Sequence, residues 1–333
     1  MDKRISDFYL KQVTPVYIDD LRFNLSLKDS FFFAGSCFSN NLALWMKKRF
    51  IKQLQIPHGN IYNPLSLKDC IEMCLNPSLF NVKDIEKQDG LYFHTSFHSM
   101  FSQNNIENYI QTIEVLLNRA KDFLKKTGCC ILTLGTAFVY QRKSTGLVVN
   151  NCHRLASNEF IRRKITIQEA VEQLIQIIKM IRFENPEAII IFTLSPVRHL
   201  RDKATENSLS KAILRCAIEE IIDQRQVFYF PSYEIMLDEL RDYRYYSSDL
   251  VHPSPEAIEY IMKGFSRICF SKEDLIHIEK LEKLISMFEH KALQPESDRY
   301  KDFIQKRTSR LKELKAQLPY LQWPEAFDFT NPP

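Results

Sequence analysis

Apolar runs alternate with amphipathic segments through the first three quarters of the chain. Strands covered on both faces are apolar throughout, and runs of this kind occupy residues 31–34, 129–140, 188–197 and 226–230. Apolar residues recur at helical spacing between these runs and after them, at residues 40–50, 66–74, 105–126, 165–186, 208–224 and, following a polar turn, 247–265. Alternating strands and helices predict βαβ units and a mainly parallel sheet with helices on both faces.

The pattern changes near Ser271. Two charged segments with helical spacing follow, at residues 272–290 and 298–318, and neither has the pattern of a strand. We therefore predict an α/β domain of residues 1–270 and a helical C-terminal extension of residues 271–333. The extension packs back on the domain or forms a homo-oligomer contact.

Composition narrows the class of protein. Hydrophobic residues make up 45% of the 333 residues and charged residues 26%, which is ordinary for a soluble globular protein. The net charge of +4 gives no reason to expect a nucleic-acid partner. No apolar run reaches the length of a membrane span, and charges interrupt the N-terminal segment where a signal peptide would be apolar. We expect a cytoplasmic protein, with its eight cysteines as free thiols rather than disulfides or a zinc site.

Glycine is scarce, which makes its positions informative. Average usage of about 7% would give roughly two dozen glycines, and this chain has 7. A glycine-rich loop for a nucleotide cannot be built from them, so no cofactor is implied. Gly35, Gly59 and Gly135 mark places where a side chain is not tolerated.

Polar residues follow the predicted strands. In open α/β sheets, ligands bind beyond the carboxyl ends of the strands. Ser36 follows the first strand, Gly135 and Thr136 lie within the second apolar run, and residues 195–199 follow the third. A loop with Asp249 and His252 follows the fourth. The fold would gather these residues at one edge of the sheet.

Two of these features together indicate nucleophilic catalysis. Ser36 lies between a strand and a helix, where free N–H groups of the helix can hold an oxyanion, although alone it reads as a helix N-cap. Asp249 and His252 are three residues apart in one loop, which could supply a general base and the carboxylate that orients it. An early Ser and a late Asp-x-x-His form a stronger signal than either alone.

Several stretches resemble a known family. The combination looks like the SGNH/GDSL hydrolase superfamily, and "FAGSCFS" resembles the signature of the related GSCFA family. Further stretches that resemble this family are "GNIYNPLS", "LTLGTAFVY", "NCHRL", "FTLSPVRHL", "ENSLSKAIL", "YFPSYEIMLDELRDYR" and "DLVHPS". The resemblance runs from about residue 31 to residue 265. It implies a flavodoxin-like three-layer α/β/α fold with a mainly parallel sheet.

The resemblance also implies roles for individual residues. Ser36 would be the nucleophile, His252 the general base and Asp249 its orienting partner. Backbone N–H groups of Ser36 and Gly59 would form the oxyanion hole. The third donor is usually an Asn in a Gly-x-Asn motif, but this chain has Gly135-Thr136-Ala137 there. The residues that could replace that Asn are Thr136, Asn60 and Asn63.

Three further residues are candidates for substrate binding, each with a plainer alternative. His153 could face the site or be structural. Arg198, with His199 beside it, could clamp a carboxylate or phosphate of the substrate or pair with a nearby acid.

Cys37 next to the nucleophile suggests a Cys–His dyad, but neighbouring residues entering a helix point about a third of a turn apart. We expect Ser36 to face His252 and Cys37 to pack under the turn.

The leading hypothesis is a serine esterase that acts through an acyl-enzyme on an O-acylated small molecule or glycan. An acyltransferase using the same site is one alternative, and a non-catalytic ligand-binding module on the same fold is the other. No metal or organic cofactor is implied.

Overall fold

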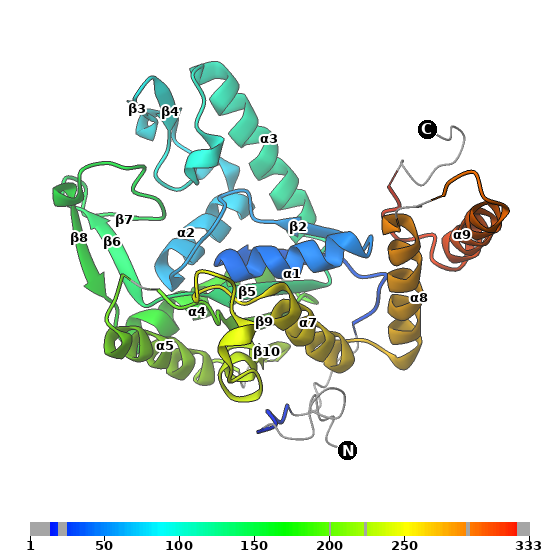
Figure 1. The fold of residues 1–333 in the computed structure, drawn as a ribbon. Coiled ribbons are helices and arrows are strands. Elements are labelled where there is room, and N and C mark those ends of the chain that lie inside the picture. The colour runs from blue at the N-terminus through cyan, green and yellow to red at the C-terminus, as the bar shows by residue number, and fades with distance from the viewer. Residues whose placement is uncertain (1–13, 19–24, 200, 223–224, 291–293, 325–333) are drawn as a thin grey trace.

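A parallel sheet forms the centre of the protein. In the computed structural model, which describes residues 14–18, 25–199, 201–222, 225–290 and 294–324, five strands pair in the order β10-β9-β5-β1-β2 (Figure 1). Their bounds are Phe31–Gly35 for β1, Gln53–Gln55 for β2, Cys129–Leu134 for β5, Ile189–Leu194 for β9 and Val227–Phe230 for β10. Every pairing is parallel. The predicted mainly parallel sheet is confirmed.

Helices cover both faces of this sheet, which confirms the three-layer arrangement. One face carries α2 (Pro64–Leu75), α3 (Ile106–Leu124), α4 (Ile167–Glu184) and α5 (Ala204–Glu219), and the other carries α1 (Cys37–Lys48) and α7 (Pro255–Cys269). Side chains of β1 alternate between the two cores, with Phe32 in the first and Phe31 and Phe33 in the second. Because successive side chains enter opposite cores and both cores are apolar, every position of β1 is apolar. The prediction of a strand at residues 31–34 is confirmed.

Two small sheets lie outside the central one. The hairpin β3 (Glu86–Gln88) and β4 (Leu91–Phe93) forms one, and β6 (Phe138–Arg142), β7 (Val148–Val149) and β8 (Phe160–Lys164) form the other. The predicted strand 129–140 is therefore two strands in different sheets. The chain breaks at Gly135 and Thr136 because both of their N–H groups bind the Tyr62 carbonyl, at 2.8 Å, instead of continuing a ladder.

Short helical segments complete the α/β domain. They are η2 (Pro77–Leu79), η3 (Val82–Asp84), η4 (Ser99–Phe101), η5 (Ser157–Glu159), α6 (Ser232–Glu234), η6 (Ile235–Glu239) and η7 (Tyr243–Tyr245). None of the helices in the described part of the chain is long and apolar enough to cross a bilayer.

The helical spacing predicts this helix from residue 66, but α2 begins two residues earlier. Asn63 is the N-cap, Pro64 is the first helical residue, and the Asn63 side chain accepts a hydrogen bond from the Ser66 N–H at 2.9 Å. Proline favours the first helical position because its missing N–H would have no partner there. Ser66 is therefore already inside the helix.

The C-terminal helices α8 (Lys272–Glu289) and α9 (Asp298–Gln317) pack back on the domain. Their apolar residues join the same core as β1 and α1; these are Ile278, Leu281, Leu284, Leu311 and Leu314. The two regions on either side of Ser271 thus share one core.

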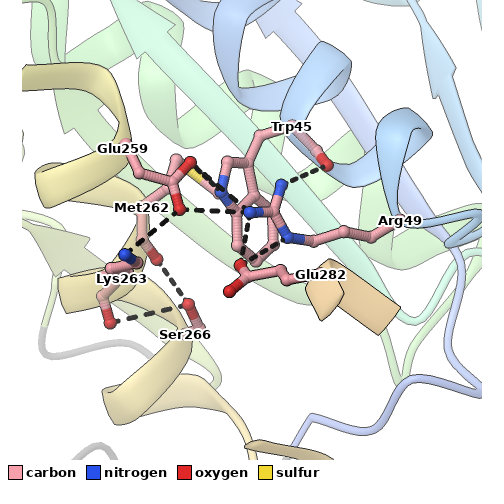
Figure 2. Close-up of polar contacts among 7 residues, drawn as sticks. All are labelled: Trp45, Arg49, Glu259, Met262, Lys263, Ser266 and Glu282. Atoms are coloured by element: carbon pink, nitrogen blue, oxygen red, sulfur yellow. Dashed lines mark hydrogen bonds and ion pairs between the residues drawn. The ribbon is translucent and has the colours of Figure 1, made fainter. Parts of the chain in front are cut away.

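A buried arginine connects three helices at this junction (Figure 2). Arg49 is the C-cap of α1 and is only 6% exposed. Its guanidinium stacks on the Trp45 ring at 3.6 Å and forms ion pairs with Glu259 of α7 at 3.1 Å and Glu282 of α8 at 2.5 Å. Trp45 also donates a hydrogen bond to Glu259 at 3.0 Å. Each of the three guanidinium nitrogens has an acceptor, because the remaining one donates to the Trp45 carbonyl at 3.2 Å. Burial of a charge requires such partners.

We predict that Arg49→Met destabilises the protein by roughly 2–3 kcal/mol, because both carboxylates lose their shared partner. Breaking a fully buried pair costs about 3–5 kcal/mol; the value here is lower because the side chains of Glu259 and Glu282 are 37% and 30% exposed. Urea unfolding measures the change. The exposed Arg310 is the control, and Arg310→Met should shift stability by less than about 0.5 kcal/mol. Equal effects of the two substitutions would contradict this role of Arg49.

Candidate active site

The first site residue lies on the turn from β1 to α1. Gly35 has a φ of +136°, and a Cβ at this position would lie 2.1 Å from the Thr133 carbonyl oxygen. Only glycine fits such a conformation and such a close approach. Ser36 follows as the N-cap of α1, but its side chain makes no capping hydrogen bond among the described residues. Its N–H donates to the Thr133 carbonyl at 3.1 Å.

Ser36 is more buried than Cys37, which is the reverse of the order expected from the sequence. Ser36 is 1% exposed, and its hydroxyl is enclosed without a hydrogen-bond partner among the described residues. Cys37 is half-buried. Burial raises the pKa of the Cys37 thiol, while N–H groups at the start of α1 and the charge of Lys211 lower it and Asp249 raises it. Cys37, rather than Ser36, is the more accessible residue.

The loop before α7 supplies a histidine and its carboxylate partner. The His252 Nδ1 and the Asp249 Oδ2 are 2.7 Å apart. The other carboxylate oxygen accepts N–H groups of His252 at 3.0 Å and Val251 at 2.9 Å. These backbone donors are the main cause that lowers the pKa of Asp249 to about 2. Because Ser254 caps α7, Asp249 is not its cap. Both members of the pair are exposed.

The strand-end residues lie near one another, because their charges affect one another's pKa. Burial, with smaller contributions from the charges of Lys211 and His252, lowers the pKa of His199 to about 4. Cys37 responds to Lys211 and Asp249, as described above. The β1–α1 turn, the segment after β9 and the His252 loop therefore lie at the same edge of the sheet. Ser36 and His252 share no hydrogen bond in the structure.

Two of the expected oxyanion donors are already engaged. The Asn63 side chain caps α2 and also donates to the Ser66 hydroxyl at 3.1 Å. The Thr136 hydroxyl lies 3.0 Å from the Ser210 hydroxyl and accepts the Phe138 N–H. Together with the N–H bonds to Tyr62, these contacts give Asn63, Gly135 and Thr136 a structural role.

The loop at Gly59 and Asn60 is less constrained. The Gly59 N–H has a long contact of 3.4 Å to the Ile56 carbonyl, and its φ is +82°. The Asn60 side chain accepts an N–H of Asn40 at 2.8 Å and hydrogen-bonds the Tyr62 hydroxyl. Among the described residues, the Asn60 backbone N–H has no acceptor. This loop retains donor capacity near the site.

The remaining candidates separate into two places. His153 is buried, stacks on Phe93 at 4.3 Å, and its Nε2 lies 3.1 Å from the His94 carbonyl, so it holds the β4 region in place. His199 contacts the edge of the Tyr62 ring at 5.6 Å, and its Nε2 is buried without a partner among the described residues. Arg198 is exposed beside it.

Lys211 lies at the same sheet edge, and the sequence analysis did not name it. It is 2% exposed and lies on α5, where its Nζ donates to the Gly135 and Ser195 carbonyls, each at 2.7 Å. Its signal was present in "SLSKAIL": Ser210, Lys211 and Leu214 all lie on the buried face of the helix. The described residues include no group of three or more His, Cys, Asp or Glu that could hold a metal ion.

We predict that Gly35→Ala destabilises the protein by roughly 2–6 kcal/mol, the sum of backbone strain and overpacking. Gly90→Ala is the matched control, since Gly90 has a φ of +80° but nothing within 4 Å of an added Cβ. It isolates the backbone cost of about 1–2 kcal/mol. Thermal and urea unfolding measure both, and a Gly35 variant no worse than the control would contradict the close approach to Thr133.

Two family patterns match separate parts of the chain. The pattern of the GSCFA family matches residues 30–265, and that of the GSCFA domain protein, C-terminal domain, matches residues 281–329. No curated protein matches. A solved structure, an acetyl xylan esterase (Est2A) from the rumen bacterium Butyrivibrio proteoclasticus, is similar at 12% identity with a TM-score of 0.39. The similarity covers 76% of this chain and 65% of that one, which is under two thirds of its length. The two family matches together span most of the sequence, and the chain belongs to the GSCFA family.

Proposed function

We propose that this protein is an acyl-transfer enzyme that hydrolyses an ester of an O-acylated small molecule or glycan. The observation that carries the proposal is the 2.7 Å contact between His252 Nδ1 and Asp249 Oδ2, in a loop at the same sheet edge as the Ser36–Cys37 turn. A carboxylate on Nδ1 leaves Nε2 as the proton acceptor, as a general base requires.

The chain's own residues supply each step of the reaction. The nucleophile on the turn attacks the ester carbonyl, and its proton passes to His252 Nε2. His252 then returns that proton to the departing alcohol oxygen as the C–O bond breaks. Water, activated by the same imidazole, releases the acid from the acyl-enzyme; a second hydroxyl in place of water would make the enzyme an acyltransferase. Since the pKa of Asp249 is about 2, its carboxylate stays ionised and stabilises the imidazolium.

The developing oxyanion needs donors, and the geometry favours the Gly59–Asn60 loop. The Ser36 N–H is already bound to Thr133, whereas the Asn60 N–H has no acceptor among the described residues and that of Gly59 has only a long one. The N-terminus of α1 adds positive potential at the same turn. We therefore propose Asn60, with Gly59, in the role of the missing Gly-x-Asn.

Ser36 is the nucleophile that the family resemblance implies. Its enclosed hydroxyl must become accessible before it can attack an ester. The position and exposure of Cys37 favour it as a second candidate. It is the first residue of α1, and it is half-buried rather than enclosed. Asp249 lies close enough for its charge to raise the pKa of the Cys37 thiol. Attack by Cys37 would form a thioester with the same proton transfers. A binding module without catalysis is the remaining alternative, in which the fold holds a ligand and neither Ser36 nor Cys37 acts as a nucleophile.

We predict that hydrolysis of p-nitrophenyl acetate requires His252 and one residue of the turn. Removal of a general base typically costs 10²–10⁴-fold, so His252→Ala should lower kcat/KM by about that factor. Ser36→Ala or Cys37→Ala should do the same, while the other remains close to wild type.

Mass spectrometry after treatment with a phosphonate probe and with iodoacetamide identifies the labelled residue independently. Glu256→Gln, an exposed change near the start of α7, is the control and should leave turnover unchanged. Turnover that survives His252→Ala would rule out the proposed mechanism. A wild type that neither turns over esters nor takes up either probe on the turn would favour the binding module.

A further inference from the structure

Helix α5 holds the loop beyond β5 through two consecutive residues. The Ser210 hydroxyl accepts the Ala137 N–H at 2.7 Å and contacts the Thr136 hydroxyl at 3.0 Å. Lys211 donates to the Gly135 carbonyl at 2.7 Å. Gly135, Thr136 and Ala137, which stand where the Gly-x-Asn motif is missing, are thus all held by hydrogen bonds from α5.

This loop forms the wall beside the nucleophile turn. A Cβ added to Gly135 would lie 3.4 Å from the Ser36 Cβ and 3.2 Å from Tyr62. Lys211 also donates to the Ser195 carbonyl at 2.7 Å, so it joins the carboxyl ends of β5 and β9. A movement of the Lys211 side chain would therefore change the wall against which Ser36 lies.

A charged side chain is a costly means of making two hydrogen bonds to carbonyls. A buried ammonium loses its hydration, and a neutral amide could donate to both acceptors without that loss. Burial lowers the pKa of Lys211 to about 7, although the Cys37 thiol raises it. An ammonium has three N–H groups, and only two acceptors contact it among the described residues. Lys211 is thus charged below about pH 7, although bracing two carbonyls alone does not need a charge.

We propose that Lys211 is a positioning residue of the acyl-transfer site, which fixes the Gly135–Ala137 loop against Ser36 and Cys37 and does so as a cation. This inference rests on the proposed function. A negative charge forms on the ester carbonyl oxygen as the nucleophile attacks. A fixed positive charge at this edge stabilises that oxyanion and compensates for the absent Asn, because electrostatic interactions are strong where water is excluded.

The charge state of Lys211 makes a pH dependence part of the inference. The titratable groups that face it come from three other elements: Cys37 on α1, His199 after β9 and Tyr233 on α6, whose ring lies 5.7 Å from the Nζ. Lys211 is charged below its pKa and neutral above it. Turnover of the wild type should therefore fall as pH rises through about 7.

Three substitutions separate the charge from the hydrogen bonds. Lys211→Arg keeps both, Lys211→Gln keeps amide donors without the charge, and Lys211→Met removes both. We expect the Gln and Met variants to lose roughly 10²-fold in kcat with little change in KM, the cost typical of a lost oxyanion contact. The Arg variant should keep turnover within about tenfold and lose the decline above neutral pH. Lys203→Met, at an exposed position before α5, is the control.

Circular dichroism and thermal unfolding establish that each variant is folded before its kinetics are compared. A Gln variant as active as wild type would show that the charge is dispensable. A folded Arg variant as impaired as the Met variant would show that the charge does not restore turnover. Either result overturns the inference. Turnover that depends on His252 but not on Lys211 would overturn this inference alone. If the wild type turns over no ester, the proposed function fails in its own experiment, and the role of Lys211 falls with it.

Discussion

The close approach of β1 to β5 at Gly35 is the constraint on which the site depends. With Gly35 at a φ of +136° and its Cα against the Thr133 carbonyl, the chain leaves the sheet in a direction that a side chain would block. The Ser36 N–H then binds the same carbonyl, and α1 begins one residue later. Ser36 is enclosed and Cys37 is half-exposed because of this one backbone geometry. The helix N-terminus, the thiol and the hydroxyl all take their positions from it.

A second set of contacts fixes the facing side of the edge. Tyr62 contributes its carbonyl to Gly135 and Thr136 and its ring to His199, while Ser210 and Lys211 bind the same loop from α5. The polar groups at the carboxyl ends of β5 and β9 are therefore largely satisfied by one another. The His252 loop remains exposed on the solvent side of these contacts.

The sequence predicted the central sheet well because its strands are covered on both faces and are apolar throughout. It failed at β2, a short edge strand whose residues Gln53–Gln55 are mostly polar, and at Gly135, where an apolar run continues across a change of sheet. Strand-end topology was enough to bring Ser36, His199 and His252 to one edge. The burial of Ser36 and of Lys211 was not predictable, since both depend on packing between segments distant in the chain. The cap role of Asn63 was not predicted, and it depends on the Pro64 that follows as the first helical residue.

The shared core has a consequence for how the protein is made. Leu281 and Leu284 of α8 and Leu311 and Leu314 of α9 fill the same apolar layer as Phe31 and Phe33 of β1. A ribosome synthesises these helices after the α/β region, so the part of this core that α8 and α9 cover stays open until they are made. During that interval the nascent chain presents an apolar surface that a chaperone can bind, and the ion pair between Arg49 and Glu282 cannot form.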